Sequence, residues 1–579
     1  MSHQHSCEVT SVYTMRIPLC PSRTCKVILL PDVCSSHFTP QMPLPPRPLG
    51  VMTLGSVTPR LWASAFTIGL SSLLFGYSLA CLNTVITCSS TPCPKGSILT
   101  NLNLSLEEQQ LATAMTIIGA MLGGLFASYP NDHFGRRKSL LFNNIFFLIG
   151  GVLTAIASLD SILVGRFLLG LGTGVESMVA PVLLSEIASN ETRGAITSLH
   201  QLNITLGILI SNLIGYGFVP NVDGGWRYVQ LFVVLPAALQ VLLFWLVPES
   251  PRWLLRADRR EDARSVLSHL RICKKGDAAA QAAGAELVEA ELVALEQELG
   301  SSMKQPTAGW KETFSYGKAM RIGMLMMFFS AMTGINTVIF YSTTIFALAG
   351  VENAFLGTVL VGILNVIITM VSGYLVDKAG RKVLLTGGTW IMLVSLLLLG
   401  SILLADGVPP VAISIVAVGS MLLYVFGFAI GIGAVQWVVV GEVVPTKIRS
   451  KAYSIFVTSN WTANLVISLV TLSLIDALGK SLASAGSSVE KQEQLGVALL
   501  YMCFAGMCVL CLLFLYFLVP ETKHQHEEKA AHHHRRVSSE FAVADVDIIT
   551  EVVHCVEAHG EGPVDAPADA AGKQPVSMV

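Results

Sequence analysis

The sequence has few charged residues for its length. Only 13% of its 579 residues are Asp, Glu, Lys or Arg and 52% are hydrophobic, whereas roughly 25% of a typical soluble domain is charged. So few charges cannot hydrate the surface of a soluble protein of this size, and we expect a polytopic membrane protein with the lipid bilayer as its main partner. The net charge of −2 points to no charged partner, and no nucleic-acid binding is expected.

The sequence also lacks the residue groupings that enzymes and metalloproteins need. Its 12 cysteines are scattered without a metal-ligand cluster, and no nucleophile–base pair or phosphate-binding loop is found. We therefore expect no enzyme activity, cofactor or metal site. Cys88 and Cys93 are the exception among the cysteines, because both fall in a predicted extracellular loop where a disulfide could persist. A disulfide and a free pair both stay open.

The N-terminus has no hydrophobic core followed by a small-residue cleavage site, so no signal peptide is predicted. Residues 1–59 are expected to be a disordered cytosolic tail, although a misassigned chain start also fits. Residues 520–579 are polar and low in aromatics, which predicts a second disordered cytosolic tail.

What the sequence does have is long apolar runs. A spanning helix needs about 20 mostly apolar residues. Twelve runs qualify: 61–86, 109–129, 138–158, 161–184, 194–219, 226–247, 318–348, 353–376, 383–405, 410–441, 450–477 and 494–519. They predict an all-α membrane protein of two six-helix bundles, residues 60–247 and 318–519. Residues 248–317 between them are polar and are expected to form a cytosolic helical domain.

The loops between these spans predict the orientation. Basic motifs such as "GRRK" (135–138) and "KAGRK" (378–382) fall in one set of loops, and few basic residues fall in the other. The positive-inside rule places the basic loops and both termini in the cytosol, with the plasma membrane as the expected location. Asn103 then lies outside in a sequon, where glycosylation is expected, whereas the sequon of Asn460 falls in the membrane and is discounted.

The two halves carry the same motifs at matching positions. "GRR" (135–137) corresponds to "GRK" (380–382), and "PESPR" (248–252) corresponds to "PETK" (520–523). In each half a Glu precedes an Arg by seven residues, after the fourth span and after the tenth. Such duplication is typical of secondary transporters, which bind their ligand near the midplane between the halves.

Charged residues collect at the predicted cytosolic ends of the helices. Plain topology explains the arginines but not the acids beside them, so we expect a network that bridges the halves, holds the inner gate shut and breaks when that gate opens. Arg166, nearer the membrane, is expected to pair with one of these acids. The predicted gating residues of the rim are Arg136, Arg137, Glu186, Arg193, Glu249, Asp377, Arg381, Glu442, Arg449 and Glu521.

Taken together, "DHFGRRK", "GRFLLGLGTG", "SEIASNETRGA", "HQL", "VPESPRWLL", "TGIN", "DKAGRK", "SNWTAN" and "VPETK" resemble the sugar porter family of the major facilitator superfamily. The resemblance covers about residues 60–525 and extends to facilitative hexose transporters. It implies two six-helix bundles, alternating access, and a hexose, pentose or polyol as substrate. Sugars need amide side chains for their hydroxyl groups and an aromatic plane for their C–H faces.

The resemblance also implies which residues bind the substrate. Tyr341 matches an aromatic residue near the extracellular gate, and Trp461 is expected to form a wall of the site. The implied substrate-binding residues are Gln201, Ile208, Asn336, Asn365, Trp437, Trp461 and Asn464, together with Ser330.

Some positions depart from the family pattern. Hexose carriers usually have two glutamines before "GIN", but Ser330 and Ala331 stand there, so at least one strong sugar contact is missing. The tenth span has Ala429 in place of an acid and no Pro. It therefore lacks the helix breaks that Pro supplies, although Gly431 and Gly433 leave some flexibility.

Proton-coupled relatives resemble one another in carrying an acid in the first span, where this sequence has Ser78. Because Ser does not titrate in the physiological range, we favour facilitative uniport. Two alternatives stay open. One is a proton-coupled sugar or inositol-like polyol symporter that uses Glu176, the one acid well inside a span. The other is a transporter-like sugar sensor that signals through its tails.

Overall fold

In the computed structural model of this chain, the described residues are 13–14, 26–27, 58–86, 93–189, 192–272, 278–303, 309–348, 351, 353–405, 407–445, 448–482 and 489–521. They belong to two compact units, Met1–Ser56 and Val57–Val579. In the first unit, β1 (Tyr13–Thr14) pairs antiparallel with β2 (Lys26–Val27). The predicted disordered tails otherwise lie outside the described residues.

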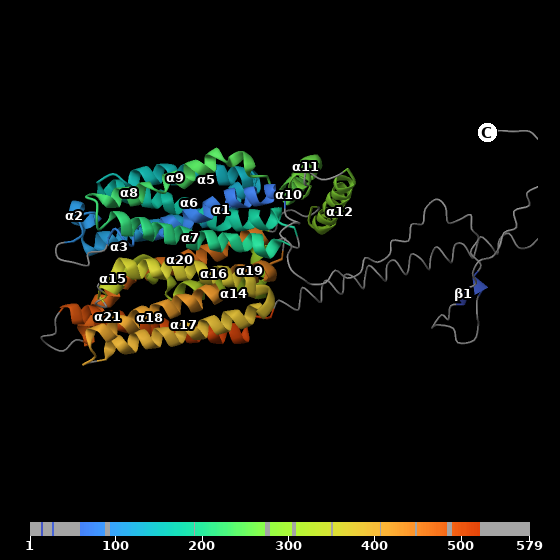
Figure 1. Cartoon of the computed structure of the whole chain (residues 1–579). Coiled ribbons are helices and arrows are strands. Elements are labelled where there is room, and N and C mark those ends of the chain that lie inside the picture. Colours follow the sequence, from blue (N-terminus) through green and yellow to red (C-terminus); the bar gives the residue numbers. More distant parts are fainter. Residues whose placement is uncertain are drawn as a thin grey trace, which may run out of the picture. The chain divides into compact units, whose positions relative to one another are not determined.

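The second unit is helical throughout its described residues, and two groups of long helices lie side by side in it (Figure 1). The N-terminal half contains α1 (Pro59–Ala80), α2 (Ile98–Leu102), α3 (Leu106–Phe126), α4 (Ser128–His133), α5 (Arg136–Thr154), α6 (Leu159–Ile187), α7 (Arg193–Phe218), α8 (Gly225–Leu231), α9 (Val234–Leu242) and η3 (Phe244–Leu246). The C-terminal half contains α14 (Gly317–Met332), α15 (Ile335–Leu348), α16 (Ala354–Ala379), α17 (Arg381–Leu404), α18 (Pro410–Phe428), η4 (Ala429–Gly433), α19 (Ala434–Val443), α20 (Arg449–Leu482) and α21 (Val489–Phe517).

Four helices connect the halves. They are α10 (Pro251–Arg256), α11 (Arg260–Arg271), α12 (Ala278–Met303) and α13 (Trp310–Ser315). The first three share a small apolar core that includes Leu254, Leu267 and Leu292. They lie at the end of the bundle where α5 and α17 begin, which we call the motif end because "GRR" and "GRK" lie there (Figure 1). The end where α1 finishes is called the opposite end.

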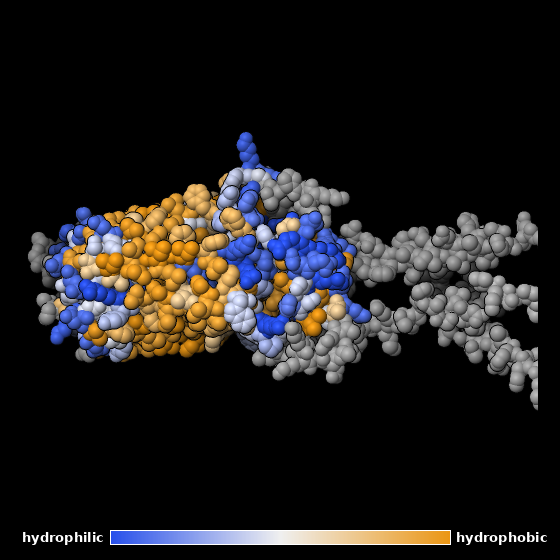
Figure 2. Space-filling model, turned by 90° about the horizontal axis from the view of Figure 1, so that it is seen from above, coloured by the Kyte–Doolittle hydropathy of each residue, from blue (hydrophilic) through white to orange (hydrophobic). Residues whose placement is uncertain are grey.

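The helical bundle has the surface of a membrane protein. Within the described residues, eight helices are long and apolar enough to cross a membrane, or nine if the bent helix of residues 449–481 is one span. Figure 2 shows an apolar band between two polar ends of the bundle. Large apolar side chains such as Leu242 and Phe517, each 73% exposed, are stable there only against lipid. Each of the twelve predicted runs coincides with one or more helices.

Two of the breaks within predicted spans lie at "TGIN" and in the tenth span. At "TGIN", α14 ends at Met332 and α15 starts at Ile335, with Gly334 between them at a φ of +95°. The Thr333 carbonyl accepts a hydrogen bond from the Tyr424 hydroxyl at 3.0 Å, so the broken helix does not leave it unpaired in the membrane. The break fixes the position from which Asn336 projects.

The second break lies in the tenth predicted span, where the sequence has no Pro. Gly431 leaves the helical region, with φ −104° and ψ −105°, inside the π-helical turn η4. A Cβ on Gly388 of α17 would lie 2.5 Å from the Gly427 carbonyl and 2.8 Å from the Gly431 Cα, so three glycines allow the two backbones to touch. The span therefore breaks without Pro, at one of the two glycines where the sequence predicted flexibility.

The loop between α1 and α3 carries two predicted features. Cys93 is disulfide-bonded, and Cys88 lies outside the described residues. Asn103 is exposed and ends α2 in a left-handed conformation, with a φ of +46°. Glycosylation at Asn103 stays a prediction.

Candidate functional site

A chain of hydrogen-bonded asparagine side chains joins α15 to α20. Asn336 Nδ2 donates to Asn464 Oδ1, and Asn464 Nδ2 donates to Asn460 Oδ1 at 3.0 Å. Asn460 in turn donates to the Met327 carbonyl at 2.9 Å. An amide both donates and accepts, so these groups can exchange partners with the hydroxyl groups of a ligand. The structure brings the predicted residues Asn336 and Asn464 together and adds Asn460, which the sequence marks only as a discounted sequon.

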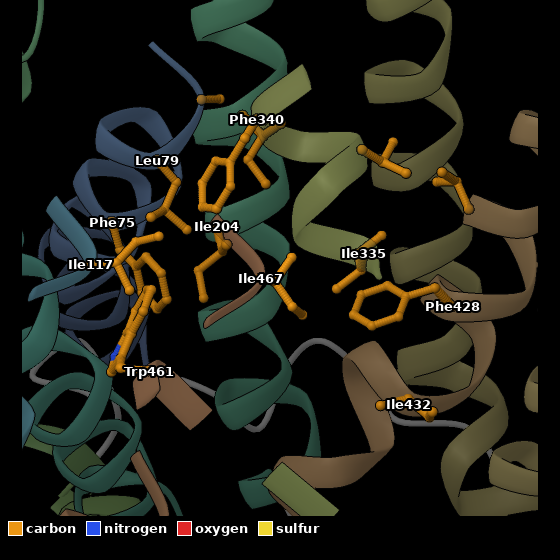
Figure 3. Packing of buried hydrophobic residues seen from close by; sticks show 14 of the residues in the cluster. Phe75, Leu79, Ile117, Ile204, Ile335, Phe340, Phe428, Ile432, Trp461 and Ile467 are labelled. Atoms are coloured by element: carbon orange, nitrogen blue, oxygen red, sulfur yellow. The ribbon is translucent and has the colours of Figure 1, made fainter. Parts of the chain in front are cut away.

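Two predicted tryptophans of the C-terminal half meet aromatic rings of the N-terminal half. Trp461 is buried, and its ring centroid lies 5.8 Å from that of Phe75 in α1 (Figure 3). Trp437 meets the His200 ring of α7 edge-on, with centroids 5.9 Å apart. Both tryptophans therefore lie at the boundary between the halves, where a ligand held by both halves must bind.

The remaining predicted binding residues lie on α7, α14 and α16. Helices α7 and α16 pack against each other across the boundary between the halves. Ile208 and Asn365 are each 6% exposed, and Gln201 is partly exposed with no hydrogen bond among the described residues. Asn365 accepts a hydrogen bond from Thr369 at 3.5 Å. Ser330 is buried in α14.

A buried polar cluster in the N-terminal half reaches the same boundary. Ser72 Oγ lies 2.8 Å from His200 Nδ1, and Ser71 Oγ donates to Gln240 Oε1 at 2.9 Å. Glu176 of α6 is fully buried beside these two serines. The sequence predicted Glu176 but missed His200, although His200 directly precedes Gln201 in "HQL". Its contact with Trp437 depends on how α7 and α19 pack, which residue spacing does not reveal.

Hydrogen bonds join the halves at both ends of the bundle. At the opposite end, Asn83 Nδ2 donates to Ser342 Oγ at 2.9 Å, which links the turn after α1 to α15. At the motif end, Ser450 Oγ donates to Asp132 Oδ2 at 3.1 Å. Tyr341 lies in α15, but its side chain is outside the described part of the structure. Asn83, in the turn after α1, is one of the residues that bridge the opposite end; Gln110 of α3 also donates to Ser473 Oγ of α20 there, at 3.2 Å.

At the motif end, the charged residues of the N-terminal half pair with one another. Arg136 donates to both Glu186 oxygens, from Nε at 3.0 Å and from Nη2 at 3.2 Å. Glu249 Oε1 accepts from the backbone N–H groups of Arg136 and Arg137, at 2.9 and 3.2 Å, and so caps the start of α5. Burial raises the pKa of the Glu249 carboxyl, and backbone N–H groups, including that of Ser250, oppose this shift.

The C-terminal half repeats the arrangement. Arg381 Nη2 donates to Glu442 Oε1 at 3.0 Å. Glu521 accepts from the backbone N–H groups of Arg381 and Lys382, at 3.2 and 3.1 Å, at the start of α17. The expectation that these acids bridge the halves is wrong for these pairs. We call Arg136 with Glu186 the N-terminal clamp and Arg381 with Glu442 the C-terminal clamp. Each clamp lies within its own half, because its arginine and its acid lie on neighbouring helices of the same repeat.

Other predicted gating residues have different surroundings. Arg137 lies over the Phe244 ring, 5.0 Å from its centroid, and Arg193 begins α7. Arg449 donates to the carbonyls of Gly441 and Val444 at 3.4 Å each, at the end of α19. The side chain of Asp377 lies outside the described residues.

The expected pairing of Arg166 with an acid of the rim is wrong. Arg166 lies two turns from the start of α6, towards the opposite end of the bundle. Its Nη1 donates to the Ser78 carbonyl at 3.1 Å and to Cys81 Sγ at 3.0 Å. The sequence placed Arg166 near the rim, but α6 runs towards the motif end and carries this residue away from it.

The chain is similar in sequence and fold to known sugar transporters. The model of the family described as Sugar (and other) transporter matches residues 64–533. Facilitated glucose transporter protein 1 of Caenorhabditis elegans is 32% identical over 81% of this chain and 89% of its own length. The galactose-proton symporter of Escherichia coli K12 is 31% identical over 79% of this chain and 91% of its own. The solved structure of the proton:xylose symporter XylE bound to 6-bromo-6-deoxy-D-glucose has a TM-score of 0.67 and 27% identity, covering 80% of this chain and 97% of that one.

Proposed function

The chain belongs to the Sugar (and other) transporter family of the major facilitator superfamily, and we propose that it carries a monosaccharide by facilitative uniport. That it is a sugar transporter rather than an enzyme agrees with the prediction from the sequence. The relatives named above include both a facilitative carrier and proton symporters, so they leave the energetics of transport open. Ser78 in the first span supports uniport, because its hydroxyl cannot carry a proton between the two sides.

The observations that carry the proposed binding site are the amide chain from Asn336 to Asn464 and the two tryptophans at the boundary between the halves. Trp437 and Trp461 both contact rings of the other half, so a sugar stacked on them would touch both halves. The bond between Asn336 and Asn464 would open to accept a sugar hydroxyl. The buried amides would remain satisfied throughout, which membrane-embedded polar groups require.

Alternating access fits the way the halves are joined. Hydrogen bonds cross the boundary at both ends, through Asn83 at one and Asp132 at the other. The neutral bond of Asn83 is worth about 1 kcal/mol and the bond to the Asp132 carboxylate about 1.5–3 kcal/mol, so breaking the hydrogen bond at either end costs little. The charged clamps within each half would keep it rigid while the halves rock. We propose twelve spans, cytosolic termini, a cytosolic location for α10–α13 and residence in the plasma membrane.

The test is uptake into proteoliposomes that contain the purified full chain. Glucose, fructose, galactose, xylose and myo-inositol are compared with and without a pH gradient. We expect uptake of one or more of these sugars to equilibrate without a gradient. Sugar binding without any flux would contradict the proposal and favour a sensor.

Site variants test the position of the binding site. Asn336→Ala and Gln201→Ala are expected to lower uptake at least about tenfold, which corresponds to about 1.4 kcal/mol for a lost sugar contact. Asn221→Ala is the matched control, because this exposed amide binds only the Gly217 carbonyl in its own turn. If Asn336→Ala and Gln201→Ala both transport as well as the control, the site lies elsewhere.

Proton-coupled transport is the second candidate, and the buried position of Glu176 favours it. Glu176 lies beside Ser72, whose hydroxyl is hydrogen-bonded to His200 next to Trp437. A proton on this cluster would therefore lie close to the sugar. If an inward pH gradient drives accumulation, Glu176→Gln should abolish accumulation and keep exchange. The exposed Glu107→Gln is the control.

A further inference from the structure

Arg166 is a buried cation without an acidic partner. Its residue is 1% exposed, and its hydrogen bonds run from Nη1 to the Ser78 carbonyl and Cys81 Sγ and from Nε to the Ala112 carbonyl, at 3.1, 3.0 and 3.5 Å. No ion pair of Arg166 exists among the described residues. A cation at this depth of a membrane protein is costly unless an opposite charge compensates it.

The acids of the same helix are too far away to compensate it. Asp160 is exposed in the first turn of α6, and Glu176 lies ten residues further along, which is about 15 Å in a helix. The neighbouring Tyr77 hydroxyl donates to the Val229 carbonyl at 2.6 Å and so points its proton away from the guanidinium. The charge of Arg166 is therefore not balanced by a carboxylate.

The Cys81 thiol does not supply the missing negative charge either. Its Sγ faces two oxygen acceptors, the Gln230 Oε1 at 3.4 Å and the Ser78 carbonyl at 3.5 Å. A thiolate would be repelled by both oxygens, whereas a thiol donates its proton to one of them and accepts from Arg166. The contacts of Cys81 thus fit a neutral thiol.

Two buried polar groups near Arg166 have no hydrogen-bond partner. Gln230 is 1% exposed and Ser78 is 0% exposed, yet Gln230 Nε2 and Ser78 Oγ have no partner within the described chain. The hydrogen bonds of Arg166 itself use only Nε and Nη1. Two buried unpaired groups that can donate, beside a positive charge with no ion pair among the described residues, are the chemistry of an anion site.

We propose that Arg166, Gln230 and Ser78 bind a small monovalent inorganic anion, with chloride as the ion of this class. The anion would accept from the three donors and balance the guanidinium charge. Cys81 is part of the same cluster and lies two residues before Asn83, which hydrogen-bonds the halves together. Anion occupancy would therefore stabilise the fold of the N-terminal half next to that contact.

The test uses the purified full chain in detergent, with sodium chloride exchanged for sodium gluconate at constant ionic strength. We expect chloride to raise the unfolding temperature saturably, by about 2–4 °C, because a ligand that binds only the folded chain stabilises it. Bromide should substitute for chloride. Arg166→Gln should remove the response, whereas Arg227→Gln, at an exposed arginine of α8, should keep it.

Two further variants keep the proposal testable if Arg166→Gln does not fold. Ser78→Ala and Gln230→Leu retain the positive charge and each removes one donor, so the chloride concentration at half-effect should rise about tenfold in each. An unchanged half-effect concentration in both would overturn the site. The same unfolding temperature in chloride and gluconate for the unmodified chain would overturn it outright. Sugar uptake is not needed for this readout, so the outcome is independent of the proposed transport.

Discussion

The two halves build their clamps at the motif end from the same residue types, yet they bury them to different extents. In the N-terminal half, the side chains of Arg136 and Glu186 are 4% and 13% exposed. In the C-terminal half, those of Arg381 and Glu442 are 13% and 14% exposed. The repeated motif therefore determines which residues pair, and residues outside the motif determine how far the pair is exposed to solvent.

The short helices that follow the N-terminal half account for the difference. Trp253 of α10 donates from Nε1 to the Asp132 carbonyl at 3.0 Å, and Arg271 of α11 donates to the Ile187 carbonyl at the end of α6 at 2.9 Å. Ser250, at the start of α10, lies beside Glu186. The C-terminal half is described only to Glu521 and shows no equivalent helices up to that residue. Within the described residues, both halves repeat the clamp, and the segment 248–317 covers the one in the N-terminal half.

Removing the arginine of each clamp should give the largest difference. Arg136→Gln leaves Glu186 buried without its bidentate partner and should cost about 3–5 kcal/mol of unfolding free energy. The Glu442 side chain is buried to a similar extent, but the Arg381 side chain is 13% exposed against 4% for Arg136, so Arg381→Gln should cost less, about 1–3 kcal/mol. The measurement is the unfolding temperature of each purified variant, with the exposed Arg227→Gln as a control near zero. Equal losses, or a larger loss for Arg381→Gln, would contradict the burial argument.

The glycine before each arginine should give a smaller difference of the same sign. Gly135 and Gly380 have φ values of +90° and +91°, so alanine is strained at both by about 1–2 kcal/mol. A Cβ on Gly135 would lie 2.4 Å from Glu249 Oε2, whereas one on Gly380 would lie 3.2 Å from Glu521 Oε2. Gly135→Ala should therefore lower the unfolding temperature more than Gly380→Ala, because it also displaces the cap of α5. Gly419→Ala, with open space around its Cβ, is the control.

The clamps show what could be predicted from the sequence. The apolar runs located the helices, and the duplicated motifs located the charged residues, because both are local patterns. The partner of each charge was predicted less well. Glu186 and Arg136 are fifty positions apart, and only the packing of α5 on α6 shows that they meet within one half. Arg166 was assigned to the wrong end for the same reason.

The candidate site was also only partly predictable. Motif positions named Asn336 and Asn464, and the structure joins them. The motif positions did not identify His200 or Asn83. These residues contact Trp437 and Ser342 because the two halves pack against each other. A break that depends on Pro is visible in a sequence. The break at Gly431 lies against Gly388 of α17, and a contact between two distant glycines is not visible in a sequence.

The smallest expected effect concerns α11 and α12, two of the helices that cover the N-terminal clamp. It is a change in their local stability with pH. In α12, Glu289 accepts from Arg260 at 2.7 Å, and this contact lowers the pKa of the Glu289 carboxyl. An acid with a lowered pKa in the folded state stabilises that state above its ordinary pKa of about 4.3, and the stabilisation is lost as the pH falls through the lowered value. Acidification below about pH 4.3 should therefore loosen α11 and α12.

Hydrogen exchange of the full chain, corrected for the intrinsic pH dependence of exchange, measures this loosening. Protection of α11 and α12 should fall with pH in the unmodified chain and fall less in Glu289→Gln, which has no carboxylate to titrate. Glu261→Gln is the matched control, since the Glu261 side chain is 78% exposed and 3.9 Å from Arg264. Because these helices, in the described part of the chain, cover the N-terminal clamp, acidification should bring exchange near Arg136 closer to that near Arg381. An equal pH response in Glu289→Gln and the unmodified chain would show that this ion pair does not hold the cover in place.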